Sequence, residues 1–341
     1  MVARISTTLF YHTGLSAMEQ HSNNLLRIQE QLSSGKRVNR PSDDPVAVSK
    51  LHNLNKSLNT IDQLVENGRY AKSQLELEDT VLNDSVSVLQ RARELTIQMM
   101  NDTYNAADRR AASEEIDQLI KQMRNLVNTR NPEKELLFAG VDSNAAAAFS
   151  DQAYTDTGGD PVVDMVAYTG ATTGQRFVQI GFDNDDYLAP DDNGDPSRVR
   201  IGDRGDVAFS VTGTPGGTIT LSRPDGDTVD VDNNVINVLV NLRDWLRDGQ
   251  QPPPEIGDQL YQAITNISQV QAKVGGRINR IDSQYEALQT FQLTLKEHKK
   301  NLEEVDIVKA TADFTQTQVA LQFAQQAFAK VQQMSLFNYL R

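Results

Sequence analysis

Apolar side chains recur along most of the chain at alternating intervals of three and four residues, which is the spacing of a helix with one apolar stripe. The clearest runs cover residues 51–89, 112–126, 235–248 and 260–302. Before the first run, Asp44 occupies the position expected of a helix N-cap and Pro45 that of the first helical residue. Three prolines at 252–254 precede the last run. Because a narrow stripe has to be buried against another helix, these runs predict a long antiparallel helical bundle.

The pattern changes between residues 146 and 232, where short runs alternate apolar and polar residues. Phe177–Ile180, Val207–Val211 and Thr218–Leu221 are such runs, and turn-forming Pro, Gly and Asp residues separate them. Residues 150–232 contain 16 Asp and 5 Arg but neither Glu nor Lys, and they hold 12 of the 20 glycines. The expected fold class is therefore mainly α with a β insert: an elongated antiparallel coiled-coil bundle built from both chain ends, and a small, acidic, antiparallel β domain in the middle.

Both ends of the chain carry an apolar seam with the same three-four spacing. The seam residues are Tyr11, Leu15, Met18, Leu25 and Leu32 in the N-terminal arm and Phe314, Leu321, Ala324, Phe328 and Val331 in the C-terminal arm. The arms can pair as an antiparallel coil, but the apolar residues beside the C-terminal seam exceed what one partner helix covers. We expect arms that are poorly ordered in the monomer and become helical on assembly. The alternative, in which they pack back on the central bundle, stays open.

Charge and composition exclude several classes of function. The chain has 33 Lys and Arg against 46 Asp and Glu, a net charge of −13, which argues against nucleic acid as a partner. It contains no cysteine and no apolar run of the roughly 20 residues that a membrane span needs, so we expect no thiol chemistry and no membrane insertion. The first residues lack the apolar stretch of a cleaved signal peptide, which leaves open export without one.

Few residues suggest chemistry. Asp43 and Asp44 are an imaginable acid–base pair, but a helix cap beside Pro45 explains them without catalysis. The four histidines are isolated. A calcium-binding loop is a second hypothesis, although an EF-hand's twelfth-position glutamate is missing and a solvated acidic loop explains the same residues: Asp183, Asp185, Asp186, Asp191, Asp192 and Asp195. We expect no enzyme, no cofactor and no metal site.

Four segments together resemble the bacterial flagellins and hook-associated proteins. They are Leu32–Pro45, with the sequence LSSGKRVNRPSDDP, Leu136–Gly140, Val274–Arg280, and the tail from Glu304 to Leu340. The resemblance covers roughly residues 1–145 and 235–341. Its connector motif comprises Gly35, Arg37, Asn39, Pro41, Asp43, Asp44 and Pro45. We interpret this motif as a stiffened link between arm and bundle, with ion pairs between subunits as a hypothesis.

The resemblance implies a structural protein of the bacterial flagellum. Within the family, Arg4–Thr7, Pro41–Pro45 and the ending Ser335–Leu340 favour the hook-associated proteins at the hook–filament junction, which polymerise through their terminal helices. It implies an extracellular place at that junction, export without a cleaved signal peptide, and three kinds of assembly partner: neighbouring hook-associated subunits, flagellin and further copies of the chain, besides an export chaperone. A filament flagellin, or a secreted adhesin-like rod, remains the alternative.

The resemblance also implies a division into three domains. Residues 1–34 and 305–341 would form the terminal coiled-coil arms, residues 35–145 and 233–304 a helical rod, and residues 146–232 an acidic β-rich outer domain.

Overall fold

The computed structural model describes the backbone of residues 7–182 and 197–339, and the side chains of most of them up to residue 330. Helices are α1 (Thr7–Ser34), α2 (Pro45–Met99), α3 (Ala106–Val127), α4 (Gly205–Ala208), α5 (Val235–Arg247), α6 (Pro254–Glu303) and α7 (Ile307–Tyr339). Strands are β1 (Phe149–Asp151), β2 (Tyr154–Thr155), β3 (Pro161–Val162), β4 (Val166–Tyr168), β5 (Phe177–Gln179), β6 (Arg198–Arg200), β7 (Thr218–Ser222) and β8 (Thr228–Asp232). Helices dominate and the strands fall between α3 and α5, so the predicted fold class is confirmed.

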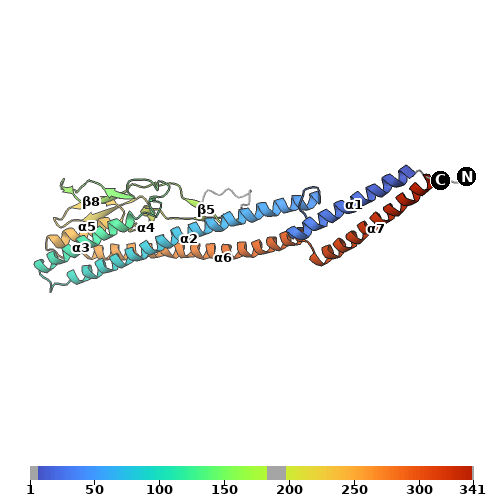
Figure 1. Ribbon diagram of the computed structural model, residues 1–341. Helices are drawn as coiled ribbons and strands as arrows, with labels where there is room; N and C mark the ends of the chain where they lie inside the picture. The colour runs from blue at the N-terminus through green and yellow to red at the C-terminus, as the bar shows by residue number, and fades with distance from the viewer. Residues whose placement is uncertain (1–6, 183–196, 340–341) are drawn as a thin grey trace. The chain divides into compact units, whose positions relative to one another are not determined.

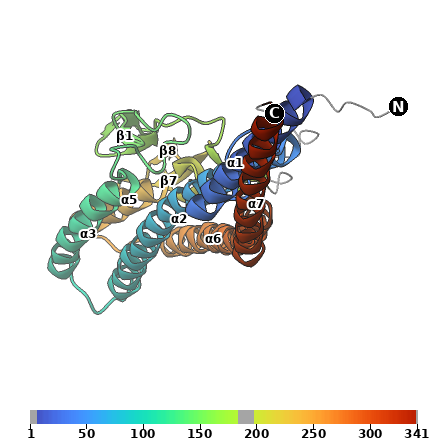
Figure 2. The same cartoon turned by 45° about the vertical axis from the view of Figure 1, so that its right-hand side comes forward.

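The chain forms two compact units. Unit 1 comprises residues 1–62 and 289–341, and unit 2 comprises residues 63–288. In unit 1, α1 and α7 run antiparallel and lie side by side in both views (Figures 1 and 2). The division into arms, rod and outer domain stays a prediction.

Unit 2 contains the longest apolar stripes, and their residues are buried as the spacing predicts. Within this unit α2 and α6 lie side by side (Figure 1), and Lys72 of α2 pairs with Asp282 of α6 at 2.7 Å. On the buried faces the side chains are fully enclosed: Leu75, Leu82 and Leu89 in α2, and Leu260, Ile267 and Val274 in α6. Helix α3 packs along α5, whose apolar residues extend the same core.

The β segments form four separate two-stranded antiparallel sheets in the described chain: β1–β4, β2–β3, β5–β6 and β7–β8. The predicted strands at Phe177–Ile180 and Thr218–Leu221 are present as β5 and β7. The strand predicted at Val207–Val211 is wrong, because residues 205–208 form the short helix α4. Most of that run is buried on both faces, and the N–H groups of Val207 and Ala208 donate to the carbonyl of Arg204.

Three aromatic rings pack together where the segment after α3, strand β1 and the end of α4 meet. The ring centroids of Phe138 and Phe209 lie 4.8 Å apart, and those of Phe149 and Phe209 lie 6.0 Å apart, all in edge-to-face geometry. Phe138 and Phe209 are completely buried. Gly140 follows with a φ of 67°, in a position where an added Cβ would lie 2.9 Å from the carbonyl oxygen of Ala171.

A buried ionic cluster links α2, the segment after β6, and α6. Glu78 is 1% exposed, and its Oε1 accepts the backbone N–H of Asp203 at 2.9 Å. Asp203 pairs in turn with Arg200 at 2.5 Å and with Arg277. No described residue donates to Oε2 of Glu78. Burial, followed by the charge of Asp203, raises the pKa of Glu78 to about 8, against the partial opposition of the two arginines.

Candidate assembly site

The connector, residues 35–45, joins α1 to α2 and is bonded to the chain at the end of α6. Gly35 ends α1 with a φ of 71°, a conformation that glycine adopts without strain, and its carbonyl accepts the N–H of Val305 at 3.1 Å. The N–H of Arg37 donates to the carbonyl of Glu303 at 2.7 Å. These two backbone hydrogen bonds fix the connector inside unit 1.

Asp43 closes a tight turn within the connector. Its Oδ2 accepts the backbone N–H of Asn39 at 3.1 Å and that of Arg40 at 2.9 Å. Pro41 lies exposed in the same turn, where its ring restricts the backbone. The carboxylate of Asp43 therefore orders the backbone of the motif.

Asp44 caps α2, which begins at Pro45. Its Oδ1 accepts the N–H of Ala47 at 2.9 Å, and its Oδ2 lies 3.1 Å from Nη1 of Arg37. The hydrogen bond from Ala47, followed by that from Arg37, lowers the pKa of Asp44 below its ordinary value. The predicted role of Asp44 as the N-cap of α2 thus accounts for its hydrogen bond from Ala47.

The cations of the connector have carboxylate partners inside the chain. The pairs are Lys36 with Glu303 at 2.5 Å, Arg37 with Asp44 at 3.1 Å, and Arg40 with Glu30 at 3.0 Å. Arg37 also donates to the carbonyl of Leu302 at 3.1 Å. Exposed pairs of this kind are individually weak, so they stiffen the connector mainly as a set. Ion pairs between subunits stay a prediction.

The predicted seam of α1 is only partly enclosed. Met18, Leu25 and Leu32 are half-buried, whereas Tyr11 and Leu15 are 46% and 38% exposed. The ring of Tyr11 nevertheless contacts α7, because its centroid lies 5.2 Å from that of Phe328.

Three residues of α1 that the seam prediction missed are less exposed than their predicted neighbours. Gly14 and His21 are half-buried and Ile28 is 8% exposed. At Gly14 an added Cβ would lie 3.0 Å from the ring of Phe328, so the glycine leaves room for that ring. A sequence signal existed, since positions 14, 18, 21, 25, 28 and 32 also follow the three-four spacing.

The predicted seam of α7 faces inward with more regularity. Its half-buried residues follow one another at intervals of seven, three and four positions: Phe314, Leu321, Ala324 and Phe328. The side chain of Val331 lies outside the described side chains. Even in this seam the large side chains keep part of their surface in water, as expected for two helices without a third.

A second group of apolar residues on the helix pair lies outside the predicted seam and is exposed to water. We call this group the outer set; it comprises Leu9, Leu26, Val308, Val319 and Phe323, which are 65%, 59%, 82%, 42% and 66% exposed. Helix α7 has only three charged residues among its 33, Lys309, Asp313 and Lys330. A helix with so little charge and apolar residues beyond its paired face is suited to burial against further helices.

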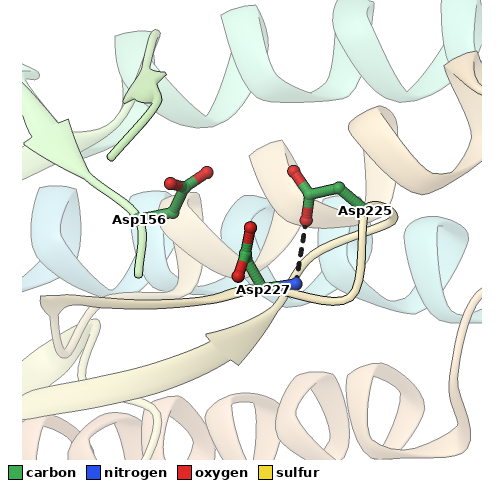
Figure 3. A group of neighbouring side chains, drawn as sticks. All are labelled: Asp156, Asp225 and Asp227. Carbon is green, nitrogen blue, oxygen red and sulfur yellow. Dashed lines mark hydrogen bonds between the residues drawn. The ribbon is translucent and has the colours of Figure 1, made fainter. Parts of the chain in front are cut away.

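Unit 2 offers one group of carboxylates with metal-ligand spacing among the described residues. Oxygen atoms of Asp156, Asp225 and Asp227 all lie within 4.8 Å of one another (Figure 3). Asp225 accepts the N–H of Asp227 at 3.0 Å, and Asp156 accepts that of Asp160 at 2.8 Å. These hydrogen bonds account for the arrangement as two turns. The aspartates of the calcium hypothesis, between 183 and 195, lie outside the described residues.

Comparison with known families matches both ends of the chain. The model of the bacterial flagellin N-terminal helical region matches residues 5–143, and that of the bacterial flagellin C-terminal helical region matches residues 258–340. The chain belongs to the flagellin family. The two matched regions contain α1, α2, α3, α7 and most of α6. The unmatched residues 144–257 hold all of the described strands.

Two curated relatives of this flagellin-family chain match it over its whole length. Flagellar hook-associated protein 3 of Salmonella typhimurium is 25% identical over 340 residues, which cover 99% of this chain and 100% of that protein. Flagellin FlaB2 of Treponema pallidum is 24% identical over 343 residues, which cover 100% of this chain and 98% of that protein. Among solved structures, a putative flagellar hook-associated protein from Vibrio parahaemolyticus has the same fold, with a TM-score of 0.55 and 18% identity over 77% of this chain and 100% of that chain. No helix in the described part of the chain is long and apolar enough to cross a membrane.

Proposed function

We propose that the chain is a structural component of the bacterial flagellum that joins the hook to the flagellin filament and polymerises through its terminal helices. The observation that carries this proposal is the outer set on the charge-poor pair of α1 and α7, in a chain that belongs to the flagellin family. The likeness to hook-associated protein 3 along the whole chain supports the junction in particular.

Assembly would bury what the helix pair leaves in water. Complete burial of one large apolar side chain contributes about 1.5–3 kcal/mol. Val308 and Phe323 are among the most exposed members of the outer set, at 82% and 66%, so each has most of that contribution still to gain. Several such residues per copy can offset the entropy lost when copies become fixed to one another.

The roles of the two apolar groups then differ. The seam residues, such as Phe314 and Leu321, hold α1 and α7 together and are half-buried already. The outer set would contact neighbouring subunits: hook-associated proteins on one side, flagellin on the other, and copies of this chain around the axis. The place of action would be extracellular, after export without a cleaved signal peptide and with an export chaperone.

A filament flagellin is the second candidate function. It is supported by the match to flagellin FlaB2, which covers the whole chain at nearly the same identity. The two candidates differ in what a cell lacks without the chain, because a junction protein is needed before any filament grows.

The deciding experiment is deletion of the coding sequence in its own organism, followed by electron microscopy of the cells and assay of flagellin in the medium. Bare hooks and shed flagellin are expected of a junction protein, and reintroducing the chain should restore filaments. Normal filaments after deletion would refute the proposal, whereas loss of the filament protein itself would favour the flagellin alternative.

A pair of matched variants tests the role of the outer set. Phe323→Ser should abolish or strongly reduce filament restoration without lowering the helix content of the purified chain. Gln322→Ser, at the exposed position beside it, is the control and should restore filaments as the unchanged chain does. Equal restoration by both variants would argue against an assembly role for Phe323.

A further inference from the structure

Unit 1 contains a cationic cleft of about 680 Å³ where the connector meets the last turns of α6. Four lysines line it: Lys36, Lys296, Lys299 and Lys300. The lining also includes three apolar side chains: Val305, Leu58, which is 9% exposed, and Ile307, which is 66% exposed. The cleft thus combines positive charge at its rim with apolar surface, and it is large enough for several side chains.

The glutamates of the cleft do not balance its lysines. Glu303 lies 2.5 Å from Lys36 and 3.9 Å from Lys299, so one carboxylate serves two cations. Lys300 has the more distant partner, Glu304, at 3.8 Å. Lys296 donates to the amide oxygen of Gln292 at 3.0 Å, and no carboxylate of the described residues lies within 4.0 Å of it. Four lysines and two glutamates leave the cleft positive.

This positive surface contrasts with the rest of the chain. Unit 1 holds 13 Lys and Arg and 10 Asp and Glu, whereas unit 2 holds 20 Lys and Arg and 36 Asp and Glu. The molecule therefore carries an acidic unit and a unit with a basic cleft. Another copy of the same chain brings the charge that this cleft lacks.

We propose that the cleft binds an acidic segment from unit 2 of a second copy of the chain. Carboxylates of that segment would contact Lys296, Lys299 and Lys300, and an apolar side chain between them would lie against Leu58 and Ile307. This inference rests on the proposed function, because it requires that copies of the chain assemble with one another. Because the cleft and the acidic segment are different surfaces, the contact can repeat from copy to copy instead of closing into a dimer.

Charge reversal in the full chain tests the cleft. Lys296→Glu with Lys300→Glu should weaken self-association at low salt by at least tenfold, measured by sedimentation velocity over a range of concentrations. Lys56→Glu with Lys309→Glu is the matched control, since both lysines are exposed in unit 1, lie outside the cleft and produce the same change in net charge. Salt near 1 M, where charges are screened within about 3 Å, should remove most of the difference.

Equal association of the two double variants would overturn the proposal, and so would a lack of association of the unchanged chain at low salt. Circular dichroism checks that α6 is intact in the variants. If the glutamates unwind its last turns, the Lys296→Gln, Lys300→Gln variant keeps the test valid and should show a smaller loss of the same sign.

Crosslinking identifies the occupant. A photoreactive amino acid at position 300, in a mixture of isotope-labelled and unlabelled chains, should yield mixed crosslinks to an Asp-rich peptide of unit 2. Crosslinks confined to one copy, or to peptides of unit 1, would overturn the proposal. Restoration of filaments separates the two hypotheses: if the unchanged chain fails to restore them, the proposed function fails, and if the cleft variant restores them fully, the cleft inference alone fails.

Discussion

Replacement of Glu78 by Gln should change how the stability of unit 2 depends on pH. Glu78 is buried in the ionic cluster with Asp203, Arg200 and Arg277, and its pKa is about 8 in the folded chain against an ordinary value of 4.5. Between these values the folded chain holds a proton that the unfolded chain has released. Raising the pH across this range therefore favours unfolding. The contribution of Glu78 to the free energy of unfolding is fully present below pH 4.5 and is completely lost above pH 8.

The size of the effect follows from the shift. Each pH unit between 4.5 and 8 removes up to about 1.4 kcal/mol, so the upper bound of the loss is roughly 5 kcal/mol. The favourable charges of Arg200 and Arg277, which act on the ionised form, are already contained in the folded pKa of about 8. Gln has nearly the same shape and no proton to lose, so the Glu78→Gln variant should lack this part of the pH dependence. Its Oε1 can still accept the N–H of Asp203.

Urea unfolding between pH 5 and pH 9 measures the difference. The single tryptophan, Trp245 in α5, is half-buried and donates to the carbonyl of Ser222 at 2.9 Å, so its fluorescence reports the unfolding of unit 2. Glu76→Gln, at an exposed position of the same helix, is the control. If the free energies of unfolding of the unchanged chain and of Glu78→Gln run parallel from pH 5 to pH 9, the reasoning is refuted.

Two further substitutions test local structure. Gly140→Ala should cost about 1–3 kcal/mol of unfolding free energy, because φ is 67° there and the new Cβ would meet the carbonyl of Ala171. Gly159→Ala is the control: φ is 95°, but no atom lies within 4 Å of the new Cβ, so this substitution should cost less. Equal costs in urea unfolding would contradict the steric argument. Asp44→Ala should lower the melting temperature of the helical signal in circular dichroism, since it removes the cap of α2 and the partner of Arg37, and an unchanged transition relative to an Asp313→Ala control would argue that the cap is dispensable.

Sequence reasoning found the helices because their signals are local. The three-four spacing of α2 and α6 lies within a few turns of each helix, and Asp44 with Pro45 marks the start of α2 in the sequence itself. The same reasoning led to the connector motif and the seam of α7, whose roles in assembly stay predictions. These signals can be recognised in the sequence without knowledge of the segments that pack against them.

The features it missed depend on tertiary contacts or on small geometric differences. In α1 the residues least exposed include Gly14 and Ile28 rather than their neighbours at 15 and 29, because two three-four patterns share positions 18, 25 and 32 and only packing against α7 decides between them. The pattern of residues 207–211 predicts a strand where the structure has the short helix at residues 205–208, since burial on both faces hides the period. The cluster of Glu78 and Arg277 joins residues about 200 positions apart, which no local pattern reveals.

The described strands of unit 2 are divided among four pairs and are two to five residues long. A longer continuous sheet would present rows of unpaired backbone groups at its edges, where a strand from another molecule can add. The edges of the strands described here are too short to align a foreign strand over more than a few hydrogen bonds. In an assembly that holds many copies at high local concentration, such a surface permits close crowding of neighbours without strand exchange between them.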